Sequence, residues 1–140
     1  SKSDVVIMAA AVADFRPVAQ WHDKLKKAKG IPEVVLEAPP DILAGLGASK
    51  PAGQVLVGFA AETSDLVANA TGKLRSKNLD LIVANDVSKP GVGFQHDTNA
   101  VTMVRADGTT SSISLTDKKA IAKAVVDTVV EILTSKIKNP

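Results

Sequence analysis

A short apolar run followed at once by small and then charged residues most constrains how this chain folds. Residues 5–8 read VVIM, and residues 9–16 read AAAVADFR. Such a run is typical of a strand buried on both faces of a helix-covered parallel sheet. Ligands of open α/β sheets bind outside the carboxyl ends of the strands, which is where Asp14 and Arg16 follow here. From these residues alone, a capped turn and a solvated basic loop would fit equally well.

Strand patterns and helix patterns then alternate along the chain. Strands are expected at residues 33–38, 54–62 and 80–86, and helices at residues 42–47, 65–77 and 118–136. Ser64 or Asp65 is expected to cap the second helix, and Thr116-Asp117 the third. The third helix has an apolar stripe that predicts its buried face: Ile121, Val125, Val129, Ile132 and Leu133. An Asp-Gly turn at residues 106–108 joins two alternating segments, residues 99–105 and 111–115, which predicts a β-hairpin. The sequence therefore predicts an α/β, Rossmann-like three-layer domain with a mostly parallel sheet and a C-terminal antiparallel hairpin.

Composition excludes several classes of protein. The 140 residues contain no Cys, so a disulfide framework, a thiol nucleophile and a zinc–thiolate cluster are excluded. A net charge of +2 is too small to indicate nucleic-acid binding. No apolar run has the length of a membrane span, and neither a dinucleotide-binding nor a P-loop glycine motif occurs. We therefore expect a cytoplasmic protein with no membrane or nucleic-acid partner, and a nicotinamide dehydrogenase is disfavoured.

Polar residues gather where the predicted strands end, and we expect them to line one crevice. They are Asp14, Arg16, Glu62, Thr63, Asn85 and Asp86. Lysines that could bind an anionic ligand are Lys24, Lys26 and Lys27 in one loop, and Lys73 and Lys77 on one helix face. A mobile charged loop and a solvated helix terminus explain the same lysines without a ligand. Phe59 fits either the core or a flat platform for a base.

Seven motifs together resemble a known family. They are AAAVADFRP (9–17), KxKK (24–27), PPDIL (39–43), VGFAAET (57–63), Lys73 with Lys77, DLIVANDV (80–87) and GFxxDxN (93–99). In this order and spacing they resemble phosphopantothenate–cysteine ligase, the synthetase half of the bifunctional coenzyme A biosynthesis flavoprotein of bacteria. The resemblance covers nearly the whole chain.

The resemblance implies a CTP-dependent ligase that joins 4′-phosphopantothenate to L-cysteine through an acyl-cytidylate, with Mg²⁺ whose ligands it does not assign. It implies that Lys24, on a flap, acts in catalysis. The CTP-binding positions it implies are Asp14, Lys24, Pro40, Asp41, Ile42, Leu43, Phe59, Lys73 and Lys77. The substrate-binding positions expected with it are Ala10, Ala11, Arg16 and Asn85. It further implies a homodimer and, in the full-length protein, an N-terminal FMN-dependent decarboxylase domain.

Family members carry an upstream segment with a glycine-rich turn and an Asn needed for acyl-cytidylate formation. We therefore expect residues 1–140 to be the C-terminal portion of one ligase domain whose N-terminal portion is missing. We also expect the chain alone to bind nucleotide weakly and to turn over little. Two alternatives stay open: another nucleotide-binding α/β module, flavin- or nicotinamide-linked, and a non-catalytic interaction domain that uses the basic loop on an acidic partner.

Overall fold

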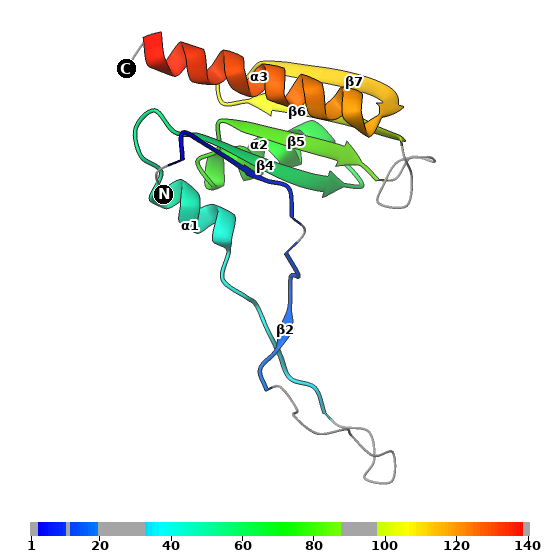
Figure 1. Ribbon diagram of the computed structural model, residues 1–140. Coiled ribbons are helices and arrows are strands. Elements are labelled where there is room, and N and C mark those ends of the chain that lie inside the picture. Colours follow the sequence, from blue (N-terminus) through cyan, green and yellow to red (C-terminus); the bar gives the residue numbers. More distant parts are fainter. Residues whose placement is uncertain (1–2, 11, 20–32, 88–97, 139–140) are drawn as a thin grey trace. The chain divides into compact units, whose positions relative to one another are not determined.

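The computed structural model of the chain describes residues 3–10, 12–19, 33–87 and 98–138 (Figure 1). It divides into two units, each described by itself. The sheet unit comprises residues 1–9 and 42–140, and the hairpin unit comprises residues 10–41. Within the described residues, no helix combines the length and the apolar character needed to cross a bilayer.

The sheet unit is built on one five-stranded mixed sheet. Its strands, in spatial order, are β1 (Val5–Met8), β4 (Val55–Glu62), β5 (Leu81–Asp86), β6 (Thr98–Arg105) and β7 (Thr110–Asp117). The β1–β4 and β4–β5 pairs are parallel, and the β5–β6 and β6–β7 pairs are antiparallel. The α/β class, the mainly parallel order and the C-terminal hairpin predicted from the sequence are thus confirmed.

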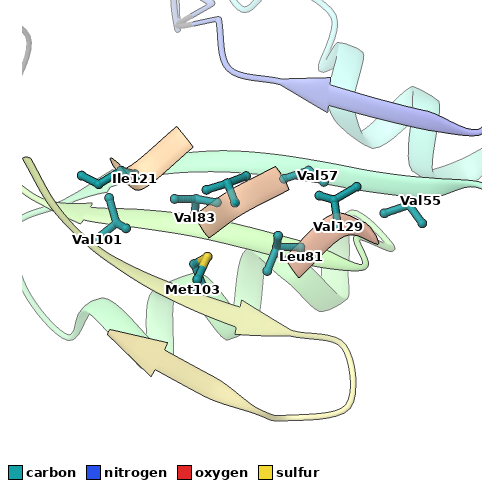
Figure 2. Close-up of a cluster of buried hydrophobic side chains, with 9 residues drawn as sticks. Val55, Val57, Leu81, Val83, Val101, Met103, Ile121 and Val129 are labelled. Carbon is teal, nitrogen blue, oxygen red and sulfur yellow. The ribbon is translucent and has the colours of Figure 1, made fainter. Parts of the chain in front are cut away.

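Helices cover both faces of the sheet. α1 (Ile42–Ala48) and α2 (Leu66–Ser76) pack on one face, here called the α2 face. α3 (Lys118–Lys138) packs on the other, the α3 face, through the stripe that the sequence predicted, which includes Ile121, Val125 and Val129. Figure 2 shows this stripe against apolar side chains of β4, β5 and β6. The three-layer arrangement follows from these two separate cores.

Strand alternation decides which residues belong to which face. Val55 and Val57 of β4 pack in the core under α3, whereas Leu56 packs in the core under α1 and α2. The register of β4 with β5 runs without interruption from Val57 to Glu62. Because successive side chains of a strand point to opposite faces, Phe59 belongs to the α3 face and Glu62 to the α2 face.

β1 differs from its prediction. The sequence predicted a strand buried on both faces, but β1 is an edge strand and Ile7 is 43% exposed. β1 pairs with β4 along one side, and no described strand pairs with its other side. A strand with a single neighbour and few covering side chains cannot be fully buried. The apolar pattern gave the correct element and the wrong burial.

Helix termini show where local sequence signals succeed and fail. Asp117 caps α3 as predicted, because its Oδ1 accepts a hydrogen bond from the backbone N–H of Ala120 at 2.9 Å. Asp65 precedes α2 but has a left-handed backbone and makes no side-chain cap bond. α2 ends with Asn78 in the left-handed region, while the N–H of Leu79 bonds to the carbonyl of Leu74. This Schellman-type end turns the chain directly into β5.

The described part of the hairpin unit, residues 10, 12–19 and 33–41, contains little regular structure. β2 (Arg16–Pro17) and β3 (Leu36–Glu37) pair antiparallel, and Val18 donates a backbone hydrogen bond to Val35. The strand predicted for residues 33–38 is therefore present but only two residues long.

Candidate functional site

The carboxyl ends of the parallel strands form a stepped edge, here called the carboxyl edge. Met8, the last residue of β1, lies beside Gly58, whereas β4 and β5 continue to the Glu62–Asp86 pair. β4 and β5 therefore extend beyond β1 at this edge. As the sequence predicted, the polar residues that end β4 and β5 are neighbours.

Glu62 and Lys73 form an ion pair at this edge. The Nζ of Lys73 lies 2.8 Å from Oε1 of Glu62, and the Glu62 side chain is only 10% exposed. The Lys73 side chain is 48% exposed, so its ammonium group meets both the carboxylate and solvent. An ammonium group has three N–H donors, so two remain for a ligand when one is given to Glu62. The sequence put Glu62 in the crevice but gave no signal for this partner.

Helix geometry explains how Lys73 reaches the strand end. α2 follows β4 and leads into β5, which is parallel to β4, so α2 runs away from the carboxyl edge. Side chains on a helix lean toward its N-terminus, and the long Lys73 side chain therefore points back toward the edge. Lys77 lies one turn further away, as the C-cap residue of α2. Of the two predicted lysines, Lys73 thus reaches the carboxyl edge, whereas Lys77 lies one helical turn further from it.

The start of α1 supplies two more predicted residues, which differ in environment. Ile42 is exposed, whereas the Leu43 side chain lies in the core under α1 and α2. A ligand could therefore meet the side chain of Ile42, but it would meet only the backbone of Leu43.

Phe59 and Asn85 lie on the other side of the sheet from Lys73. Both lie two residues beyond a side chain of the same strand that packs under α3, Val57 in β4 and Val83 in β5, and therefore share that face. Phe59 is 37% exposed. The Oδ1 of Asn85 is buried and accepts no hydrogen bond from the residues that the structure describes. Since Lys73 projects from α2, a ligand that touches both Phe59 and Lys73 must cross the carboxyl edge from one face to the other.

Five predicted site residues that the structure describes belong to the hairpin unit, and their approach to the carboxyl edge stays a prediction. They are Ala10, Asp14, Arg16, Pro40 and Asp41. Within this unit, the Nε of Arg16 donates to Oε1 of Glu37 at 2.8 Å, and both side chains are well exposed. Lys24 and Ala11 lie outside the described residues, as do Lys26 and Lys27.

A cavity of about 200 Å³ lies at the opposite, amino edge of the sheet, beside α3. Most of its charged lining is ion-paired, Asp80 with Lys136 and Arg105 with Glu131, and the carboxylate of Asp107 accepts a hydrogen bond from the backbone N–H of Thr109. In the part of the chain that the structure describes, no three acidic, His or Cys side chains gather as metal ligands do. The half-exposed side chain of Lys73 therefore makes the carboxyl edge the better candidate site.

Comparison with known proteins finds relatives that align with most of this chain. The chain is 53% identical over 106 residues to the coenzyme A biosynthesis bifunctional protein CoaBC of Bacillus subtilis strain 168, covering 76% of this chain and 26% of that protein. It is 42% identical over 123 residues to a cysteine/cysteine sulfinic acid decarboxylase of an unknown prokaryotic organism, covering 88% of this chain and 34% of that protein. The chain thus spans about a third or less of the length of these relatives.

A solved structure extends the likeness to three dimensions. The crystal structure of the C-terminal domain of a CoaBC protein superimposes with a TM-score of 0.74 at 38% identity, covering 96% of this chain and 57% of that one. The sequence profile described as DNA/pantothenate metabolism flavoprotein C-terminal domain matches residues 1–133. The resemblance found in the seven motifs is confirmed: this chain belongs to the family of DNA/pantothenate metabolism flavoprotein C-terminal domains.

Proposed function

We propose that this chain is part of a CTP-dependent phosphopantothenate–cysteine ligase of coenzyme A biosynthesis, and that residues 1–140 belong to one ligase domain. The observation that carries the proposal is Lys73, whose ammonium group lies 2.8 Å from Glu62 at the carboxyl edge and whose side chain is half exposed to solvent. Family membership over residues 1–133 supports it, since relatives of this family include proteins of coenzyme A biosynthesis.

The proposed reaction has two steps. A carboxylate oxygen of 4′-phosphopantothenate attacks the α-phosphorus of CTP, and pyrophosphate leaves as an acyl-cytidylate forms. The amine of cysteine then attacks the acyl carbonyl, CMP leaves, and the amine loses a proton as the amide forms. Negative charge on the phosphate oxygens must be offset in the first step, which positioned cations do most effectively.

In this proposal different residues of the sheet unit contact different parts of the nucleotide. Lys73, and behind it Lys77, meet the phosphates through charge-assisted hydrogen bonds. Phe59 offers an exposed aromatic surface to the base, and Ile42 with the backbone of Leu43 borders the same nucleotide. Asn85, whose buried Oδ1 has no donor among the described residues, is proposed to contact the pantothenate-bearing substrate.

The remaining roles fall on residues whose position relative to the carboxyl edge is not described. We propose that Asp14, Pro40 and Asp41 contact CTP, that Ala10, Ala11 and Arg16 contact the other substrate, and that Lys24 acts in catalysis. Mg²⁺ would enter as the Mg·CTP complex, since Mg²⁺ binds readily through substrate phosphates and few protein ligands.

The proposal extends to assembly and compartment. By the family resemblance, the enzyme is a homodimer, it works with an FMN-dependent decarboxylase domain, and it acts in the cytoplasm. These three statements rest on the family resemblance alone.

Nucleotide titration followed by NMR tests the proposal and detects even the weak binding expected of the chain alone. The ¹⁵N-labelled chain is titrated with CTP, ATP and NADH, the triphosphates with Mg²⁺. We expect amide shifts near Glu62 and Lys73 that saturate at lower CTP than ATP concentrations. Tighter binding of NADH would favour a nicotinamide-linked module instead. The absence of shifts with every nucleotide would contradict a nucleotide site in these residues.

A further inference from the structure

Ion pairs of the sheet unit fall into different exposure classes, and the Glu62–Lys73 pair has unequal partners. In the Lys50–Asp80 pair both side chains are about 90% buried, with 10% and 9% exposed. In the Lys123–Asp127 pair both are mainly exposed. In the pair at the carboxyl edge the Glu62 side chain is 10% exposed and the Lys73 side chain is 48% exposed. Burial of both partners is typical of a structural link, whereas the unequal exposure of Glu62 and Lys73 leaves the lysine side chain accessible to a ligand.

Burial of Glu62 fixes where that outward charge lies. Its side chain ends β4 on the α2 face, with 10% of its surface exposed, so the carboxylate cannot follow a mobile partner into solvent. A lysine without a partner loses rotamer freedom when it binds a ligand, because its stem is long and flexible. A lysine already bonded to a fixed carboxylate has lost part of that freedom beforehand, which favours binding.

We propose that Glu62 is a positioning residue, which holds the ammonium group of Lys73 at the carboxyl edge for the phosphates of a nucleoside triphosphate. The identity of the nucleotide, CTP, rests on the proposed function. Glu62 acts through Lys73 and touches no substrate itself. Loss of the Glu62 charge therefore weakens phosphate binding, although it leaves Lys73 with more uncompensated positive charge.

A competing role gives the opposite sign. A carboxylate that merely neutralises Lys73 would compete with phosphate, and its removal would tighten binding. A carboxylate that only fastens β4 to α2 would change unfolding, and any effect on binding would persist after Lys73 is removed. These roles can therefore be distinguished by measuring binding to the wild-type chain, to single variants at Glu62 and Lys73, and to the double variant.

The experiment measures the dissociation constant of Mg·CTP by NMR titration of the chain and of its variants. The variants are Glu62→Gln, Lys73→Met, the double variant, and Glu131→Gln as the matched control. Gln keeps the volume and the acceptor oxygen of Glu62. Glu131 pairs with Arg105 at the other edge of the sheet, so the control makes the same chemical change far from the site. Glu62→Asp, which keeps the charge but shortens the reach, replaces Glu62→Gln if the latter unfolds.

We expect Glu62→Gln to weaken CTP binding about five-fold and Glu131→Gln to leave it unchanged. In the Lys73→Met background, we expect Glu62→Gln to have no further effect on binding. Equal or tighter binding by Glu62→Gln while the wild-type chain binds CTP would overturn the positioning role and leave the proposed function standing. A five-fold loss that persists without Lys73 would also overturn it. Lack of CTP binding by the wild-type chain would overturn both.

Discussion

Gly47 of α1 faces the backbone carbonyl of Lys77 so closely that a Cβ built on Gly47 would lie 1.9 Å from that oxygen. The two helices thus touch through backbone at their C-terminal ends, on the α2 face. Asn78 reinforces the contact, because its Nδ2 donates to the carbonyl of Gly47 at 2.9 Å. Because Gly47 has no side chain, α1 can pack directly against the backbone of Lys77, a proposed phosphate ligand.

Replacement of Gly47 by Ala should destabilise the sheet unit. The added methyl group meets backbone, which has to shift, and such overpacking costs about 1–3 kcal/mol. Gly45→Ala is the matched control in the same helix, because nothing lies within 4 Å of its added Cβ. It should stabilise by up to about 1 kcal/mol through helix propensity. Urea unfolding of both variants measures the difference, and equal stabilities would contradict the close contact.

Asp80 holds together the amino edge of the sheet. Its carboxylate accepts bonds from Lys50 at 3.0 Å, from Lys136 at 2.6 Å and from the N–H of Leu56 at 2.8 Å. Asp80→Asn removes the charge between two lysines, one of them buried, and should cost about 3–5 kcal/mol. Asp127→Asn breaks an exposed pair and should cost less than about 1 kcal/mol. Both free energies of unfolding come from urea titration; similar losses would show that the cluster around Asp80 adds no specific stability.

Asp107, in the turn between β6 and β7, should make the stability of the β6–β7 hairpin sensitive to acid. The backbone N–H of Thr109 donates to its carboxylate at 2.8 Å, and this bond lowers the pKa of Asp107 below its ordinary value. The stabilisation is present above the unfolded-state pKa and is lost as pH falls through the lower folded-state pKa. The stability difference between wild type and Asp107→Asn should therefore shrink on acidification. Unfolding at a series of pH values checks this; a constant difference would contradict it.

Lysine replacements should separate binding from chemistry in the proposed ligase. Lys73→Ala and Lys77→Ala should each weaken CTP binding by about 1–3 kcal/mol, because a charge-assisted contact is lost. Lys24→Ala should slow turnover more than it weakens CTP binding. Pyrophosphate release in a ligase-active protein that contains this chain gives the rate, and nucleotide titration gives the affinity. Unchanged activity of Lys24→Ala would favour the interaction-domain alternative.

Sequence patterns predicted those features that depend on periodicity or on neighbouring residues. The α3 stripe through Ile121, Val125 and Val129 and the cap at Asp117 follow directly from spacing along one helix. The order of strands and helices follows from alternating patterns in the same way. Each of these features is encoded within a few turns of chain.

Features that depend on distant contacts could not be predicted in this way. Glu62 and Lys73 are eleven residues apart, and their pairing requires knowledge of how α2 lies on β4. The partial exposure of β1 depends on its place at the sheet edge, which no local pattern reveals. Asp65 looked like an ordinary helix cap, but its left-handed backbone prevents the side-chain bond that the residue type suggests. At the candidate site, the sequence therefore predicted residue types, and the fold supplied their geometry.

The ionic cluster around Asp80 has a consequence for how this domain can diversify. It binds α3 to the segment before β4, because Lys136 also donates to the carbonyl of Gln54 at 2.7 Å. These links lie at the amino edge, and the described side chains of Glu62 and Asn85, near the ends of β4 and β5, take no part in them. Substitutions at Phe59 or Asn85, which are proposed ligand contacts, should therefore leave these links intact. New specificities can arise at one end of the sheet while folding is secured at the other.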